Sequence, residues 1–359
     1  MDSLKPTRLG VVMAGGYGER FWPLSKPERP KQLLKLTHPD QTMLEEAIHR
    51  MDPIVEHVYV STSELLAPAL EQSGIAEAGD IFAEPARRNT LGALCWTVAN
   101  LIARGYREAT VGVVTADHAI GSVDRFQGAV EAALTVAETA GGLVTLGIRP
   151  TRPETGYGYI EIDSRRAIEL GEWTAYASNA FREKPDAETA EVYASSGQHL
   201  WNGGMFFFTI PEFLRELSAT APDAHQTTLR ISEALEVGDE DRACECFSEL
   251  PNLSIDYAVM EQAQVVHVVP VDFPWDDVGA WDSLERTLPP DEEGNVRQGK
   301  AVLLDVKSSV VVNDEDGKIV ALLGVEDLVV VNTGDAILVC HKSQAQRVKQ
   351  LVARVGEVS

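Results

Sequence analysis

The chain has 359 residues, 44% of them hydrophobic and 24% charged, which is typical of a globular protein with one large and one smaller domain. Its formal net charge of −24 argues against a nucleic-acid partner, because an acidic surface without a basic stripe repels backbone phosphates. The apolar runs are far shorter than the roughly 18 to 20 residues that a membrane span needs, so we expect no membrane association.

The N-terminus and the cysteines indicate the compartment. Residues 1–8 are polar and lead directly into an apolar strand, without the pattern of a secretory signal. The cysteines, Cys95, Cys244, Cys246 and Cys340, fit neither zinc-ligand nor redox-pair spacing. We therefore expect reduced thiols and a cytoplasmic protein.

The first 150 residues alternate between strand and helix patterns. Short apolar runs predict strands at 9–13, 57–61, 111–115 and 143–148. The clearest helical pattern covers 89–104, with Asn89 or Thr90 as its N-cap. This alternation predicts an α/β fold with a doubly wound, Rossmann-like parallel sheet, in which ligands bind at the carboxyl ends of the strands.

The pattern changes twice in the second half of the chain. Strands dominate 156–208 and helices dominate 211–264. A proline-led acidic linker at 289–294 then precedes short valine-rich strands and a final helix. We expect a large domain over 1–288 and a C-terminal all-β module over 295–359. We find no strict repeat period in this module, which leaves a left-handed β-helix open.

A glycine-rich turn follows the first strand. Ala14, Gly15, Gly16 and Gly18 let backbone N–H groups converge on an anion, and phosphate is the natural ligand. Residues 1–50 hold eight Lys or Arg against six Asp or Glu, which also favours an anion site.

Two familiar glycine loops compete for this segment. A Walker A loop needs Gly-Lys-Ser/Thr where Gly18-Glu19-Arg20 stands, so it is excluded. A dinucleotide fingerprint needs a third glycine at Phe21, which makes it a weaker alternative. A merely tight turn would not explain the cations that follow, and cations are what a triphosphate requires. These cations are Arg20, Lys26, Arg29 and Lys31.

Residues 15–25, Gly-Gly-Tyr-Gly-Glu-Arg-Phe-Trp-Pro-Leu-Ser, followed by Pro30-Lys31-Gln32, resemble the signature loop of mannose-1-phosphate guanylyltransferases, within the sugar nucleotidyltransferases. Further blocks of the resemblance are Glu84-Pro85, Arg88-Asn89-Thr90, Ala116-Asp117-His118, 181–185, 201–206, 254–261 and 275–281. The resemblance implies transfer of GMP from GTP to α-D-mannose 1-phosphate. The sequence departs from the family's pattern at Leu91-Gly92-Ala93 and Gly203, and the length leaves no room for the isomerase domain of longer members, so we expect a single activity.

The resemblance also assigns the metal and the catalytic cations. Asp117 follows the strand at 111–115, and two carboxylates from distant positions suit Mg²⁺ together with substrate phosphates. The resemblance implies that Asp117 and Asp277 hold Mg²⁺, with Asp276 as a substitute for Asp277. We expect Arg20 to stabilise the β/γ leaving group and Lys31 to neutralise charge near the α-phosphate.

The base and the sugar phosphate have their own candidates. Glu84 is the expected guanine-binding residue, because a carboxylate accepts hydrogen bonds from both N1–H and N2–H₂. The nearby nucleotide-binding candidates are Arg88, Asn89 and Thr90. The resemblance implies that Lys184 binds the sugar phosphate and that Glu183 and Asn202 bind sugar hydroxyls. It also implies that Gly158 allows close backbone approach.

Three rival functions remain at this point. They are transfer to another sugar 1-phosphate, a non-catalytic sugar-nucleotide sensor, and a dinucleotide-binding oxidoreductase. The joint presence of the catalytic cations and the two aspartates argues against a sensor, which has no need of a metal pair. We also expect a homodimer formed through the C-terminal module, whose strand edges need cover.

Overall fold

The structure is a computed structural model of the chain and describes residues 6–355. Its centre is a nine-stranded sheet with the order β3-β2-β1-β4-β9-β6-β10-β8-β7. These strands are β1 (Arg8–Met13), β2 (His57–Ser63), β3 (Ile81–Glu84), β4 (Thr110–Thr115), β6 (Leu143–Ile148), β7 (Tyr159–Leu170), β8 (Trp173–Arg182), β9 (His199–Thr209) and β10 (Val266–Val271).

The expected α/β architecture is confirmed, and β1 is central. It pairs in parallel with β2 on one side and β4 on the other. The strands of this sheet from the first 150 residues run parallel to one another as predicted, whereas β9, from the second half of the chain, runs antiparallel to both β4 and β6. The chain passes from β8 to β9 through α5 (Ala187–Ser195), and β9 also pairs antiparallel with β7.

Helices cover both faces of the sheet. They are α1 (Met43–Met51), α2 (Ala67–Ser73), α3 (Asn89–Ala103), α4 (Val123–Ala140), α5 (Ala187–Ser195), α6 (Ile210–Thr220), α7 (Pro222–Glu236) and α8 (Glu240–Ser248). Alternating side chains of β1 face the two layers: Val11 packs in the cluster with α3, α6, α7 and α8, and Val12 packs with α1, α2 and α4. None of the helices within residues 6–355 is long and apolar enough to cross a membrane.

The start of α3 differs from the expected cap. Arg88 occupies the N-cap position and makes no side-chain capping bond. Asn89 instead takes a left-handed φ of 58°, and its Oδ1 accepts a hydrogen bond from the Thr90 N–H at 2.8 Å. An Asn side chain tolerates this backbone by bonding locally, and Asn89 is therefore the first residue of α3 and not its cap.

The C-terminal module is a stack of parallel strands. After β11 (Trp275–Asp276) and α9 (Leu284–Thr287), it contains β12 (Val296–Gln298), β13 (Ala301–Leu304), β14 (Val310–Asn313), β15 (Val320–Leu323), β16 (Leu328–Asn332), β17 (Ile337–His341) and α10 (Val348–Val355). Strands β12, β14 and β16 form one parallel ladder, and β13 and β15 form a second.

The module contains one recurrence rather than a strict repeat. Ala301 pairs with Val320 and Val310 with Val329, both 19 residues apart, whereas Val296 of β12 pairs with Val310 at a separation of 14. Residues 301–313, Ala-Val-Leu-Leu-Asp-Val-Lys-Ser-Ser-Val-Val-Val-Asn, recur at 320–332 as Val-Ala-Leu-Leu-Gly-Val-Glu-Asp-Leu-Val-Val-Val-Asn. The two copies differ mostly in the turn between the ladders. Two copies with a variable turn are difficult to recognise as a repeat from the sequence.

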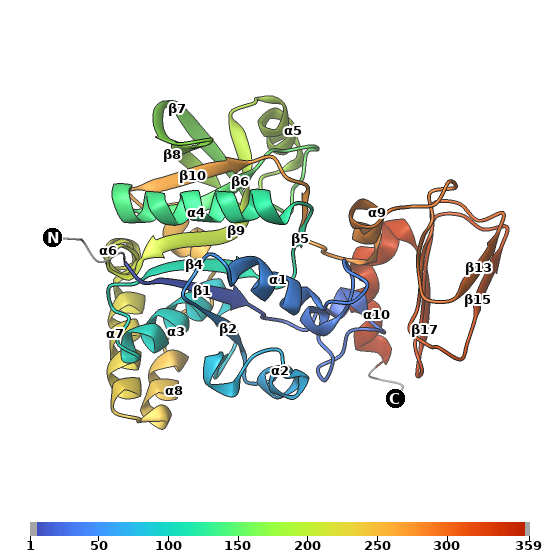
Figure 1. Ribbon diagram of the computed structural model, residues 1–359, viewed down its shortest axis with the longest axis horizontal. Helices are drawn as coiled ribbons and strands as arrows, with labels where there is room; N and C mark the ends of the chain where they lie inside the picture. Colours follow the sequence, from blue (N-terminus) through green and yellow to red (C-terminus); the bar gives the residue numbers. More distant parts are fainter. Residues whose placement is uncertain (1–5, 356–359) are drawn as a thin grey trace.

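The module shares a core with the N-terminal segment. Phe21 and Leu24, from the short helix η1 (Glu19–Phe21) and the turn after it, pack in one cluster with Trp281, Val331 and Val348. Helices α9 and α10 stand between the large sheet and the strands of the module (Figure 1). The glycine-rich turn is therefore supported from both parts of the chain.

Candidate active site

We call residues 14–32 the phosphate loop. Gly16 and Gly18 both have φ of +75°, a conformation that L side chains rarely adopt. A Cβ at Gly18 would lie 2.5 Å from the Cβ of Lys31. The Gln32 side-chain amide donates hydrogen bonds to the carbonyls of Gly15 at 3.1 Å and Gly16 at 2.8 Å. The loop thus closes on itself and fixes Lys31 against Gly18.

A cavity of about 440 Å³ lies beside this loop, at the carboxyl ends of β1 and β4. We call it the phosphate cavity. The predicted residues that line it are Gly16, Gly18, Arg20, Lys31, Asp117 and Asp277. All four predicted catalytic side chains therefore meet, although the sequence separates Arg20 from Asp277 by more than 250 positions. Ala14 and Gly15 are not among the residues lining the cavity, and the Ala14 N–H donates to the Ser61 carbonyl at 2.7 Å.

Lys31 is the buried charge of the cavity, with 4% of its surface exposed. Its Nζ donates to Asp117 Oδ2 at 3.0 Å and to the Asp277 carbonyl oxygen at 3.2 Å. Burial acts against ionisation of Asp117, but the ammonium group of Lys31 outweighs it and lowers the pKa of that carboxyl. Asp117 is accordingly a carboxylate at neutral pH.

Asp277 has one oxygen engaged and one approachable. The Tyr157 hydroxyl donates to its Oδ1 at 2.8 Å. A Cβ at Gly279 would stand 3.1 Å from its Oδ2, so glycine leaves that side of the carboxylate unobstructed. The open oxygen and the shared cavity with Asp117 are suited to a hard cation with phosphate oxygens as its other ligands.

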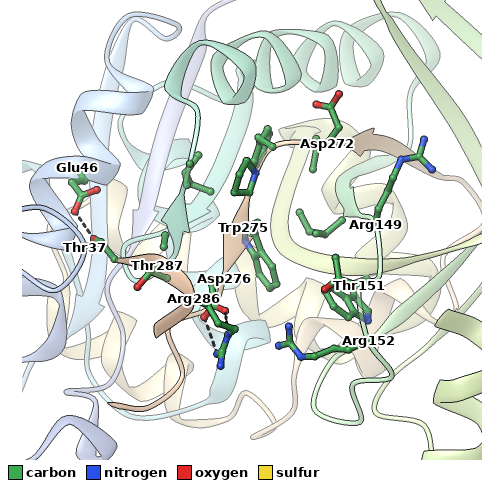
Figure 2. Close-up of a pocket in the computed structure, with 18 residues that line it drawn as sticks. Thr37, Glu46, Arg149, Thr151, Arg152, Asp272, Trp275, Asp276, Arg286 and Thr287 are labelled. Atoms are coloured by element: carbon green, nitrogen blue, oxygen red, sulfur yellow. Dashed lines mark hydrogen bonds and ion pairs between the residues drawn. The ribbon is translucent and has the colours of Figure 1, made fainter. Parts of the chain in front are cut away.

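Asp276 lies in a different place from Asp277. Its Oδ2 accepts from Arg286 Nε at 2.6 Å, and its Oδ1 accepts from the Val278 N–H at 2.8 Å. Figure 2 shows this pair in the wall of a second cavity, of about 480 Å³, which Trp275 also lines. These contacts neutralise Asp276 away from the phosphate cavity, so the geometry favours Asp277 as the metal ligand.

His118 lines the phosphate cavity but is held by a neighbour. The Trp275 indole N–H donates to its Nδ1 at 3.2 Å, and burial lowers the pKa of the imidazole. A neutral ring with one nitrogen already engaged is suited to a structural role.

Sequence analysis missed two cations of the cavity, Arg87 and Lys349. Arg87 precedes the Arg88-Asn89-Thr90 block and was passed over in favour of Arg88. Lys349 lies on α10, in the C-terminal module, and no local pattern distinguishes it from other surface lysines. Within residues 6–355, Arg20, Arg87 and Lys349 form no ion pair with a carboxylate.

The sugar-phosphate candidates form a second group. Lys184 contacts Glu183, and a Cβ at Gly158 would lie 2.5 Å from Glu183 Oε2. Asn202 donates through its backbone N–H to the Gly158 carbonyl at 2.8 Å. Lys184 has a left-handed φ of 46°. This backbone conformation is costly for a residue other than glycine, and residues that adopt it are often found at functional sites.

Asp256 completes this second group and was also missed. Its Oδ1 accepts from Asn202 Nδ2 at 2.9 Å. Burial, reinforced by the carboxylate of Glu183, raises the pKa of Asp256 to about 6. It begins a single π-helical turn, Asp256–Met260, and such turns concentrate at functional sites. The block 254–261 includes Asp256, but the raised pKa and the hydrogen bond with Asn202 arise only when the chain is folded.

The base-binding candidates lie near the end of β3 and the start of α3. Burial raises the pKa of the Glu84 carboxyl to about 8. Arg88 Nη2 donates to the Ser248 carbonyl at 2.6 Å, and Thr90 Oγ1 accepts from the Ile255 N–H at 2.9 Å. None of Glu84, Arg88, Asn89 and Thr90 is among the described residues that line the phosphate cavity.

The family profile described as Nucleotidyl transferase matches residues 9–293. The chain belongs to the nucleotidyl transferase family. A second profile, described as MannoseP isomerase/GMP-like beta-helix domain, matches residues 299–355 of this nucleotidyl transferase.

Curated relatives match this nucleotidyl transferase along most of its length. It is 38% identical to the alginate biosynthesis protein AlgA of Pseudomonas putida, over 97% of this chain and 71% of the relative. It is also 38% identical to the mannose-1-phosphate guanylyltransferase of Klebsiella pneumoniae, over 96% of this chain and 73% of the relative.

A crystal structure described as mannose-1-phosphate geranyltransferase from Thermus thermophilus has the same fold. It superposes with a TM-score of 0.85 and 37% identity, covering 98% of this chain and 99% of that one. The nucleotidyl transferase fold with its C-terminal β module is thus present in a solved relative.

Proposed function

We propose that the protein transfers GMP from GTP to α-D-mannose 1-phosphate, giving GDP-mannose and pyrophosphate. The observation that carries this proposal is the convergence of Arg20, Lys31, Asp117 and Asp277 on one cavity beside the phosphate loop. The similarity to the mannose-1-phosphate guanylyltransferase of Klebsiella pneumoniae, over 96% of this chain, supports mannose 1-phosphate as the acceptor.

We further propose that Asp117 and Asp277 hold Mg²⁺. The fit rests on two carboxylates in one cavity and on the unobstructed Oδ2 of Asp277. When bound, the ion would neutralise phosphate charge and orient the triphosphate, which is the usual contribution of Mg²⁺ to phosphoryl chemistry.

The side chains contribute alignment and charge. An oxygen of the sugar phosphate attacks the α-phosphorus of GTP, and the bond to the bridging oxygen of the β-phosphate breaks, so its electron pair leaves with pyrophosphate. A phosphate dianion needs no base to act as the nucleophile. Lys31, buried and fixed by Gly18, would face the charge on the α-phosphate, and Arg20 would bind the leaving pyrophosphate.

The acceptor would be held by the second group of residues. We propose that Lys184 binds the sugar phosphate and that Glu183 and Asn202 bind sugar hydroxyls, with Asp256 orienting Asn202 through the 2.9 Å bond between them. Gly158 supports this arrangement, since any side chain there would collide with Glu183.

The two departures from the family's pattern have local steric reasons. A Cβ at Gly203 would lie 2.9 Å from the Leu146 carbonyl oxygen, and a Cβ at Gly92 would lie 2.3 Å from Arg88 Cβ. Both glycines therefore serve backbone packing in this chain, and neither requires a different substrate.

We also propose a cytoplasmic homodimer that associates through the C-terminal module. Apolar side chains stand exposed on its strands, including Val302 at 58%, Leu304 at 61% and Leu323 at 68%. Burying such a face in a second copy would remove apolar surface from water and cover the strand edges.

Pyrophosphate release tests the proposed reaction. We expect GTP with mannose 1-phosphate and Mg²⁺ to be the fastest pair among GTP, ATP, UTP and CTP with mannose and glucose 1-phosphates. Asp117→Asn should lower turnover by roughly a hundredfold or more, because it removes a charge from the proposed metal site. Asp316→Asn, the same change at an exposed position, is the control and should leave turnover unchanged. Absence of turnover with every pair would refute the enzyme assignment.

A further inference from the structure

We propose that Lys349, on helix α10 of the C-terminal module, binds the β- and γ-phosphates of the nucleotide and the pyrophosphate product. The inference rests on the proposed nucleotidyl transfer and assigns part of the active site to the module. Lys349 is the one residue beyond position 279 among the described residues that line the phosphate cavity.

The position of Lys349 follows from how α10 is anchored. Val348, the preceding residue, is 3% exposed and packs in the cluster that contains Phe21 and Trp281. Val352, one turn further along, packs against the same cluster. The apolar side of α10 is thereby fixed on η1, the segment that carries Arg20, and Lys349 reaches the cavity from a rigid support.

The charges around Lys349 point to a polyphosphate ligand. Arg20, Arg87 and Lys349 line one cavity without a carboxylate partner within residues 6–355, and Arg20 Nε is buried without a hydrogen bond. Lys31 is instead paired with Asp117. The cavity lining holds the carboxylates Glu19, Asp117 and Asp277 as well, but none of these described carboxylates pairs with the three cations, so an anion with several charges is the ligand that suits them.

Two further ion pairs hold the module to the phosphate loop. Lys26 pairs with Asp335, and Arg29 pairs with Asp314. Each pair joins a residue in the second half of the phosphate loop to a turn of the module. Exposed pairs of this kind add little stability, but together with the shared core they define where α10 stands relative to Arg20.

Binding of inorganic pyrophosphate, GTP and GMP to the full chain, measured by isothermal titration calorimetry, tests this proposal. For Lys349→Ala we expect pyrophosphate and GTP to bind about tenfold more weakly, because one charge-assisted contact is lost, and GMP to bind as it does to the wild type. Lys349→Arg should retain most of the affinity. Arg354→Ala, which removes the same charge from the same helix outside this cavity, should bind all three ligands normally.

The proposal is overturned if Lys349→Ala binds pyrophosphate and GTP like the wild type, or if GMP binding weakens equally. Matching melting curves for Lys349→Ala and Arg354→Ala would establish that both variants are folded. Failure of the proposed transfer would look different: turnover of GTP with mannose 1-phosphate would be absent, while the difference in pyrophosphate binding between the two variants remained.

Discussion

The burial of Glu84 predicts that the affinity for GTP depends on pH. Burial raises the pKa of its carboxyl to about 8, so the free protein holds a proton there at neutral pH. Recognition of the guanine N1–H and N2–H₂ donors requires the ionised carboxylate. We therefore predict that, with Glu84 as the guanine-binding residue, binding of GTP near pH 7 releases that proton.

We therefore expect the affinity for GTP to rise with pH below 8, by up to about tenfold per pH unit, and to level off above it. Titrations of GTP at constant ionic strength between pH 6 and pH 8.5 would measure this profile. Glu84→Gln should show a flat profile and a reduced preference for GTP over ATP. A flat profile for the wild type would remove Glu84 from the role of guanine reader.

At the residue scale, prediction succeeded where a motif fixed both residue type and order. Gly16, Gly18 and Asp117 share one cavity because they follow the neighbouring strands β1 and β4, and Asp277 joins them from the end of β11. Tyr157 and Asp256 escaped because their roles come from side-chain contacts with Asp277 and Asn202, which only the folded chain creates.

At the scale of the elements, two stacked asparagines link the successive copies of the recurring segment in the module. Asn313 and Asn332 occupy equivalent positions in successive copies, and both side chains are buried. Asn332 Nδ2 donates to Asn313 Oδ1 at 2.7 Å, and Asn313 Nδ2 donates in turn to the carbonyls of Lys300 and Lys318 at 2.9 Å each. The two asparagines satisfy polar groups that the stack would otherwise bury unpaired.

Asn332→Ala should lower the free energy of unfolding by about 1 kcal/mol, because it removes the buried 2.7 Å hydrogen bond and leaves Asn313 Oδ1 with only the 3.3 Å bond from the Glu315 N–H. Urea denaturation followed by circular dichroism would measure the change. Asn252→Ala, the same substitution at an exposed position, should shift the midpoint little. Equal midpoints for the two variants would contradict a structural role for the two stacked asparagines.

Strand positions were more predictable than strand pairing. The apolar run at 143–148 coincides with β6, and the run at 9–13 falls within β1, because a buried strand in a parallel sheet needs continuous apolar residues. The antiparallel direction of β9 and the stacking of β14 on β16 depend on contacts between distant segments. A comparison of 301–313 with 320–332 would have revealed the stacking from the sequence.

At the scale of the whole molecule, the domain boundary at the linker 289–294 remains a prediction. The two parts of the chain on either side of this linker share an apolar core. Phe21 of the phosphate loop, Trp281 and Val331 of the module belong to one apolar cluster. The rings of Phe21 and Trp281 lie 5.0 Å apart edge to face, and the Trp281 N–H donates to the Trp22 carbonyl at 3.0 Å. Loosening the module should therefore disturb the phosphate loop.

Val331→Ala tests this coupling, because it removes two methyl groups from a fully buried side chain on the module side of the cluster. We expect a loss of about 2 kcal/mol in unfolding free energy from lost burial and the cavity left behind. In urea titrations, the midpoint for loss of pyrophosphate binding should fall together with that of tryptophan fluorescence. Val237→Ala, at a side chain 75% exposed, should move neither midpoint. If Val331→Ala lowered only the fluorescence midpoint, to which Trp281 of the shared cluster contributes, pyrophosphate binding would not depend on the shared core.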